Sequence, residues 1–149
     1  MQVSDAMSKL VKTVNVGSSI MEVAEIMRKN NIGSVIVLEG SGLLGGIITE
    51  GDVIKKVVAL GADPKRVTVE SVMTRDVIAI EPETTLEEAA DIMTQHKIKR
   101  LPIVKEGAVI GMISATDLIA YEKSLITKVS EILTTSSIKD QGPLGNVGG

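Results

Sequence analysis

The sequence contains no cysteine, no phenylalanine and no tryptophan, and it has one tyrosine and one histidine. Without cysteine, neither a disulfide framework nor a thiolate metal site can form. A single histidine leaves little from which to build a metal centre or a Ser-His pair, and no base and nucleophile stand in a recognisable catalytic spacing. We therefore expect no catalytic residues, no metal site and no required cofactor.

Long hydrophobic runs are also missing. No apolar stretch approaches the roughly 18 residues of a membrane span, and the N-terminus Met1–Ala6 lacks the charged and apolar regions of a secretory signal. These absences predict a soluble cytoplasmic protein with no membrane partner. The net charge of −3 and the lack of base-stacking aromatics argue against a nucleic-acid binder.

The proportions of hydrophobic and charged residues are those of an ordinary globular protein. Of the 149 residues, 44% are hydrophobic and 23% are charged, so the chain can bury a core. Because aromatic side chains are almost absent, that core must be built from Val, Ile, Leu, Ala and the seven Met residues.

An internal repeat organises the chain. At an offset of 66 residues the matches are Val3/Val69, Met7/Met73, Val11/Val77, Glu22/Glu88, Ala24/Ala90, Ile26/Ile92, Met27/Met93 and Ile32/Ile98. After a deletion of one residue the offset is 65, and the matches are Gly42/Gly107, Gly46/Gly111, Ile48/Ile113, Asp52/Asp117 and Ile54/Ile119. Each unit has about 55 residues, which is small for an independent domain, so we expect the two units to pack on each other.

Each unit has the pattern β-α-β-β-α. A short strand precedes a helix that begins at a capping-box motif, Ser19-x-x-Glu22 or Thr85-x-x-Glu88, and carries apolar residues at helical spacing. Two strands and a closing helix follow; these helices are predicted from Asp52 to about Leu60 and from Asp117 to about Lys123. The expected fold class is α+β, with two tandem units related by pseudo-twofold symmetry.

The predicted domain limits follow from the repeat and from chain-breaking residues. Repeat one spans residues 1–61, a linker that begins beside Gly61 spans 62–68, and repeat two spans 69–123. Residues 124–134 have no counterpart in repeat one and predict an added helix. Residues 135–149, rich in Ser, Thr, Gly and Pro, predict a disordered tail.

Both repeats close on the same motif, a Gly and a short apolar run followed by a hydroxyl residue and, three positions later, an aspartate: Thr49-x-x-Asp52 and Ser114-x-x-Asp117. A strand-to-helix turn of this kind places a hydroxyl and a carboxylate near a helix N-terminus, which favours anions. The motif is therefore a candidate ribose and phosphate site. It also nearly matches a capping box, which begins a helix without binding a ligand.

The Val-x-x-x-Met opening, the closing motif and the apolar-Pro-apolar-Val sequence Leu101–Val104 resemble a tandem pair of cystathionine-beta-synthase (CBS) domains over residues 3–123. The resemblance implies a regulatory module that binds adenine nucleotides (AMP, ADP or ATP) in clefts between the repeats. It also implies a homodimer, and a separate enzyme or transporter regulated in trans. Read across to this chain, the predicted nucleotide-binding residues are Thr13, Thr49, Asp52, Ala79, Arg100, Pro102, Ser114, Thr116 and Asp117.

By this resemblance the two aspartates hold ribose hydroxyls, Thr49 and Ser114 contact ribose or phosphate, and Thr13 and Ala79 offer backbone groups to the adenine edge. Two alternatives stay open. The module could be an interaction or dimerisation scaffold with empty clefts, or it could bind S-adenosylmethionine or nucleic acid instead.

The two clefts are not expected to be equivalent. Lys97, Lys99 and Arg100 precede the last-but-one strand of repeat two, whereas uncharged residues occupy the matching positions of repeat one. Because phosphate needs cationic donors, we predict tighter binding in the cleft lined by Arg100, Ser114 and Asp117. The alternative is that these cations form a solvated strand edge.

Overall fold

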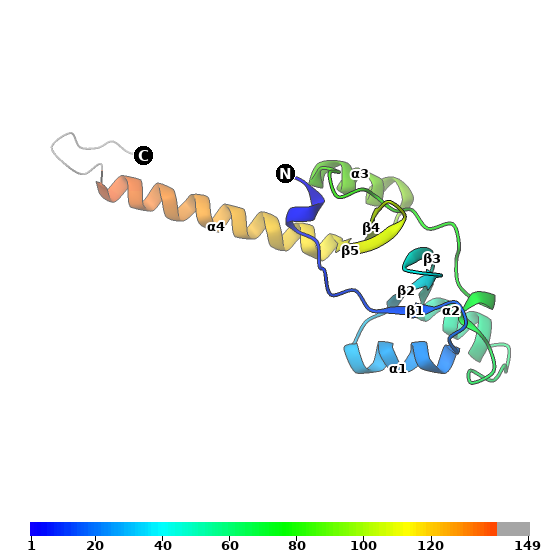
Figure 1. Ribbon diagram of the computed structural model, residues 1–149. Coiled ribbons are helices and arrows are strands. Elements are labelled where there is room, and N and C mark those ends of the chain that lie inside the picture. The colour runs from blue at the N-terminus through cyan, green and yellow to red at the C-terminus, as the bar shows by residue number, and fades with distance from the viewer. Residues whose placement is uncertain (140–149) are drawn as a thin grey trace.

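The computed structural model describes residues 1–139, with side chains described to residue 134; residues 140–149, most of the predicted tail, lie outside it. Its elements follow the predicted β-α-β-β-α order of repeat one (Figure 1). In that repeat the bounds are β1 Thr13–Asn15, α1 Ile20–Asn30, β2 Ser34–Glu39, β3 Leu43–Thr49 and α2 Glu50–Val53. A π-helical turn, Ile54–Val58, extends α2. In repeat two the bounds are α3 Leu86–His96, β4 Arg100–Lys105, β5 Ala108–Ser114 and α4 Ala115–Lys139.

The five strands form one mixed sheet in the order β1-β2-β3-β5-β4. Each repeat contributes an antiparallel hairpin, and the hairpins join where Leu43 of β3 pairs with Ala108 of β5. Both hairpins carry a bulge at the equivalent place, with Gly45 of β3 and Ile110 of β5 as the extra residues. The α+β fold with two related units is therefore confirmed.

The caps of α1 and α3 are partly those that the sequence predicts. Ser19 Oγ accepts a hydrogen bond from the Glu22 backbone N–H at 3.2 Å, and Thr85 Oγ1 accepts one from Glu88 at 3.0 Å. Neither helix shows, within the described residues, the reciprocal glutamate bond that completes a capping box. One hydroxyl bond is thus enough to begin each helix.

The predicted first strand of repeat two, residues 77–80, is reduced to a single parallel bridge between Ile80 and Ile103. In repeat one, the Ile36 backbone N–H donates to the Lys12 carbonyl at 3.3 Å and extends the pairing of β1 with β2. Pro102 occupies the equivalent position in β4 and has no N–H to donate. The hydrogen bonding between residues 77–80 and β4 therefore cannot extend as it does between β1 and β2.

The segments that precede the first strand of each repeat, residues 1–12 and 69–76, are called the leading segments here. Each of them packs on the other repeat. Val69, Val72 and Met73 are buried in the core of repeat one, whereas Val3 is fully buried in the core of repeat two. Ser8 pairs with Met112 of β5 in the same way. Each repeat fold is thus completed by a segment that belongs, in sequence, to the other repeat, so the fold units differ from the linear limits 1–61 and 69–123.

Helix α4 is continuous where the sequence predicts a closing helix to about Lys123 and a separate helix over 124–134. In repeat one, Gly61 adopts a φ of +67° just after the closing helix, a conformation that glycine accepts readily. At an offset of 65 the residue in repeat two is Ile126, and α4 contains neither Gly nor Pro. Nothing therefore ends the helix before Lys139, five residues into the predicted tail.

Candidate functional site

The two closing motifs form reciprocal capping boxes. At the start of α2, the Thr49 N–H donates to Asp52 Oδ2 at 3.0 Å and the Asp52 N–H donates to Thr49 Oγ1 at 3.2 Å. At the start of α4, the corresponding bonds between Ser114 and Asp117 are 2.9 and 3.0 Å long. The structural interpretation of the motif is therefore correct in both repeats. It leaves the second oxygen of each aspartate for other contacts.

That second oxygen has different surroundings in the two repeats. Asp52 Oδ1 lies 3.2 Å from Lys56 Nζ, and the same ammonium donates to the Val72 carbonyl at 3.1 Å. At the position equivalent to Lys56, repeat two has Tyr121. Within the described side chains, no ion pair involves Asp117.

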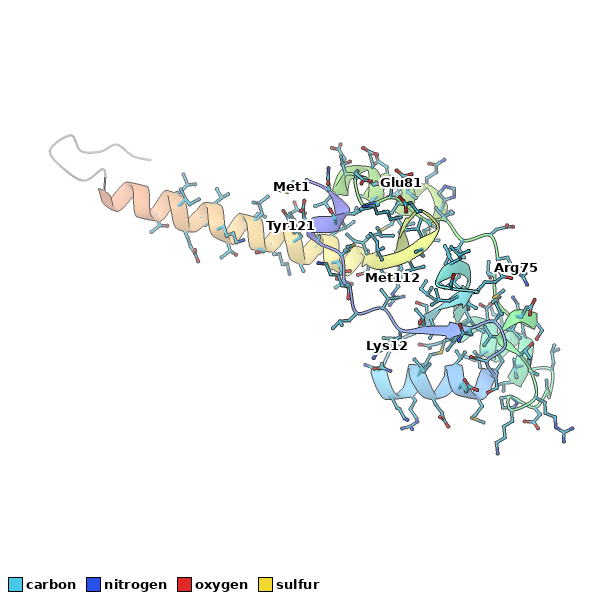
Figure 2. All side chains as sticks on the ribbon, in the orientation of Figure 1. Met1, Lys12, Arg75, Glu81, Met112 and Tyr121 are labelled. Carbon is cyan, nitrogen blue, oxygen red and sulfur yellow. The ribbon has the colours of Figure 1, made fainter. Side chains whose placement is uncertain are left out.

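A cavity of about 210 Å³ lies beside Asp117, between the two repeats. Its lining comes from three parts of the chain: the leading segment, repeat one and repeat two. The lining residues are Ser8, Leu10, Val11, Lys12, Ile32, Ser34, Arg100, Met112, Ser114 and Asp117. Figure 2 labels Lys12 in the leading segment and Met112 in β5, two of the residues that line this cavity.

The sheet register explains why Arg100 and Ser114 share this cavity. They are paired across the antiparallel strands β4 and β5, and directly opposed residues of such a pair project from the same face. Asp117 follows one helical turn later and is held in place by its bond to the Ser114 backbone. A guanidinium, a hydroxyl and a carboxylate are thereby brought to one wall.

Of the nine predicted residues, three, Arg100, Ser114 and Asp117, line this cavity. The others do not line it. Thr13 is exposed at the start of β1, Thr116 is exposed in the first turn of α4, and Pro102 is buried in β4. Ala79 is half-buried beside Ile80, and Thr49 and Asp52 belong to the equivalent turn of repeat one.

Sequence reasoning missed Lys12, Leu10 and Met112. Lys12 adds a second cation to the cavity, and Leu10, which is 89% exposed, lies at its edge. The repeat alignment carries no signal for Leu10 and Lys12, because they reach the cavity through the leading segment. Their role could not be read from spacing along the chain. Met112 lies in β5, two residues before Ser114, and its closeness to the closing motif is the signal that could have found it.

The remaining chemistry of the described residues is limited. Within the part of the chain that the structure describes, no group of three or more His, Asp or Glu side chains is placed to hold a metal ion. The helices described there also include none with the length and apolarity of a membrane crossing.

Comparison with known proteins identifies the repeats. The CBS domain model matches residues 3–59 and 69–124. The CBS domain-containing protein YhcV of Bacillus subtilis is 34% identical over 122 residues, which cover 82% of this chain and 86% of that protein. A putative signal-transduction protein with CBS domains from Burkholderia ambifaria has a similar structure, with a TM-score of 0.72 and 31% identity over 85% of this chain and 95% of that one.

A third similar structure is a hexameric CBS-CP12 protein from bloom-forming cyanobacteria, with a TM-score of 0.69 and 28% identity, covering 80% of this chain and 69% of that chain. The two matched segments coincide with the two repeats found in the sequence. The chain therefore belongs to the CBS domain family and carries two copies of the domain in tandem.

Proposed function

We propose that this protein is a regulatory module that binds an adenine nucleotide in the cavity beside Asp117. The single observation that carries the proposal is the composition of that cavity: a carboxylate, Asp117, that forms no ion pair with any described side chain, the neighbouring Ser114 hydroxyl, and the cations Arg100 and Lys12. Tandem CBS domains are regulatory modules that commonly bind adenine nucleotides. The family relation and the local chemistry thus support the same class of ligand.

Each part of a nucleotide has a suitable partner in this cavity. The vicinal hydroxyls of ribose can donate to the Asp117 carboxylate, and charge-assisted bonds of this kind are the stronger ones. Arg100 offers a planar fork to a phosphate, and Lys12 offers a second positive charge. Apolar contacts from Leu10, Ile32 and Met112 suit a purine.

Size and charge narrow the choice of ligand. The cavity volume of about 210 Å³ is below the roughly 300–1,000 Å³ typical of pockets for whole small molecules. We therefore expect the ribose and phosphate to occupy most of the cavity, with the purine against its apolar residues toward the exposed Leu10. Two cations favour AMP, ADP or ATP over S-adenosylmethionine, whose sulfonium is itself positive.

The regulated partner in this proposal is a separate enzyme or transporter, and the module itself performs no reaction. Self-association is part of the proposal, as a homodimer. The alternative is a scaffold with no bound nucleotide, which the capping role of both aspartates favours because it accounts for those residues without a ligand.

The test is thermal unfolding of the purified protein with AMP, ADP, ATP, S-adenosylmethionine or adenosine. A ligand that binds only the folded state stabilises it by mass action, by about 2.7 kcal/mol at a hundredfold excess over Kd. We expect the melting temperature to rise with the three nucleotides and to rise less with adenosine, which lacks phosphate. No shift with any nucleotide would overturn the nucleotide-binding proposal and favour the scaffold alternative.

A further inference from the structure

The C-terminal part of α4 leaves the body of the molecule. Figure 1 shows the helix projecting past the rest of the chain, and every residue from Glu122 to Thr134 is exposed. The CBS domain match ends at residue 124. This projecting part is therefore a feature of this chain beyond the domain fold, and the nucleotide cavity does not use it.

The projecting helix nevertheless carries an apolar stripe. Its large aliphatic residues recur at spacings of three and four, the pattern that gathers side chains on one helix face. With their exposed fractions they are Ile119 (55%), Leu125 (40%), Ile126 (58%), Val129 (45%), Ile132 (62%) and Leu133 (54%). Monomeric proteins rarely expose a continuous apolar patch of more than a few hundred Å², and a helix gains most of its stability by packing such a face. The stripe requires a partner.

An apolar groove runs beside the first half of the same stripe. It has a volume of about 610 Å³ and is lined by Met1, Thr85, Leu86, Glu87, Ala90, Leu118, Tyr121, Glu122 and Leu125. Tyr121 and Met1, both labelled in Figure 2, meet at this groove, where Tyr121 Oη donates to Met1 Sδ at 2.7 Å. Leu125 belongs to both the groove and the stripe, so the two surfaces are continuous.

We infer that the partner is a second copy of this chain, with the two α4 helices packed antiparallel about a twofold axis near Leu125 and Ile126. The inference builds on the self-association proposed above but not on nucleotide binding. In a twofold interface, if residue i contacts residue j, then j contacts i. An axis between 125 and 126 sets the stripe residues 126–133 of each copy over residues 118–125, and hence over the groove, of the other.

The antiparallel direction accounts for both surfaces, whereas a parallel pair does not. Parallel helices would pair the stripes residue for residue and leave each groove without helical cover. The stripe from Ile119 to Leu133 is about 22 Å long at 1.5 Å per residue. Together with the groove it gives each copy one continuous surface along α4. Antiparallel helix dipoles also attract each other.

The surface is tested with Val129→Glu and the control Thr127→Glu, two exposed positions of α4 on opposite faces. Sedimentation of the full chain over a micromolar concentration range should show a dimer for the native protein and the control. Burying an unpaired charge should weaken association of Val129→Glu by at least about tenfold. A monomeric native protein, or a Val129→Glu dimer as tight as the control, overturns the inference.

The same samples are titrated with AMP. The α4 variants should bind AMP as the native protein does, so that loss of the dimer and loss of the proposed nucleotide site are separate results. Circular dichroism of each variant establishes that α4 stays helical, and a variant that loses helix is replaced by Ile132→Glu with Glu131→Gln as its control.

The direction is tested with single cysteines, which the native chain lacks. In the antiparallel pair, Ile126→Cys lies near the axis and should form a disulfide-linked dimer under oxidising conditions. The cysteine of Leu133→Cys, which also lies on the stripe, should then lie roughly 22 Å from its copy and should not cross-link. Efficient cross-linking of both variants indicates a parallel pair and overturns the antiparallel arrangement.

Discussion

Lys56 lies against Asp52 in repeat one, with Nζ 3.2 Å from Oδ1 of the carboxylate. The Asp52 side chain is 14% exposed, and the ammonium also bonds to the Val72 carbonyl. Tyr121, at the equivalent position of repeat two, gives Asp117 no such counter-charge. Repeat one therefore neutralises its own motif aspartate, while repeat two leaves this charge to be met by something else.

This difference predicts unequal effects of two matched substitutions. Asp117→Asn should weaken AMP binding by about tenfold or more, because hydrogen bonds to a charged group contribute about 1.5–3 kcal/mol. Asp52→Asn should change it by less than about threefold, since that carboxylate is already paired. Asparagine retains an oxygen for the cap, so the folds remain comparable. Isothermal titration measures both, and equal losses would rule out the asymmetry.

The Lys56–Asp52 pair itself should contribute little to stability. Lys56 is about half exposed, 49% by side-chain area, and pairs that solvent can screen are worth roughly 0–1 kcal/mol. We expect Lys56→Met to change the free energy of unfolding in urea by less than about 1 kcal/mol. A loss of several kcal/mol would mean that the hydrogen bond from Lys56 to the Val72 carbonyl stabilises the packing of residues 69–76 on repeat one.

Arg100 is predicted to act on phosphate and not on the base. Arg100→Ala should weaken AMP binding by about tenfold, the effect of losing a charge-assisted bond, and should leave adenosine binding unchanged. Lys105→Ala, exposed at the other end of β4, is the matched control. If the control and Arg100→Ala bind AMP equally well, the cations are a solvated strand edge.

The crossover of the leading segments predicts that a substitution in one repeat loosens the other. Val3→Ala removes two buried methyl groups from the core of repeat two and should cost about 1–3 kcal/mol. Hydrogen exchange should then quicken in α3, β4 and β5 more than in β2 and β3. Val69→Ala should show the opposite distribution, because Val69 lies in the core of repeat one. The reverse pattern would disprove the crossover.

Close approach of the crossing segments also explains the repeated glycine of the third strand. A Cβ at Gly46 would lie 2.6 Å from the Thr74 carbonyl oxygen, a backbone atom that cannot rotate away. Gly46→Ala should therefore cost about 1–3 kcal/mol. Gly17→Ala, where a Cβ meets nothing within 4 Å, should change stability by less than about 0.5 kcal/mol. Urea unfolding of both variants measures the difference in the free energy of unfolding. Equal stabilities would show that β3 and the Thr74 backbone can move apart without loss of stability.

Much of the fold could be predicted because its signals are local. Alternating and helical spacing of apolar residues defines strands and helices within one segment, and the offset of 66 residues reveals the duplication by comparison of the chain with itself. The caps at Ser19 and Thr85 are local in the same sense. The charge difference around Arg100 is also visible in the sequence, since it requires only an alignment of the two repeats.

The remainder depended on contacts between distant residues. Spacing along the chain cannot reveal that Val3 completes the core of repeat two, that Lys12 reaches the cavity of Asp117, or that Lys56 also bonds to the Val72 carbonyl. Pattern alone also misplaced the end of α4, because the absence of a breaker at Ile126 becomes informative only beside Gly61. The sequence by itself determined two α/β repeats with a hydroxyl and an acid at each closing turn. Only the tertiary structure decided which leading segment completes which core and which residues share the cavity beside Asp117, because these contacts join parts of the chain that are distant in the sequence.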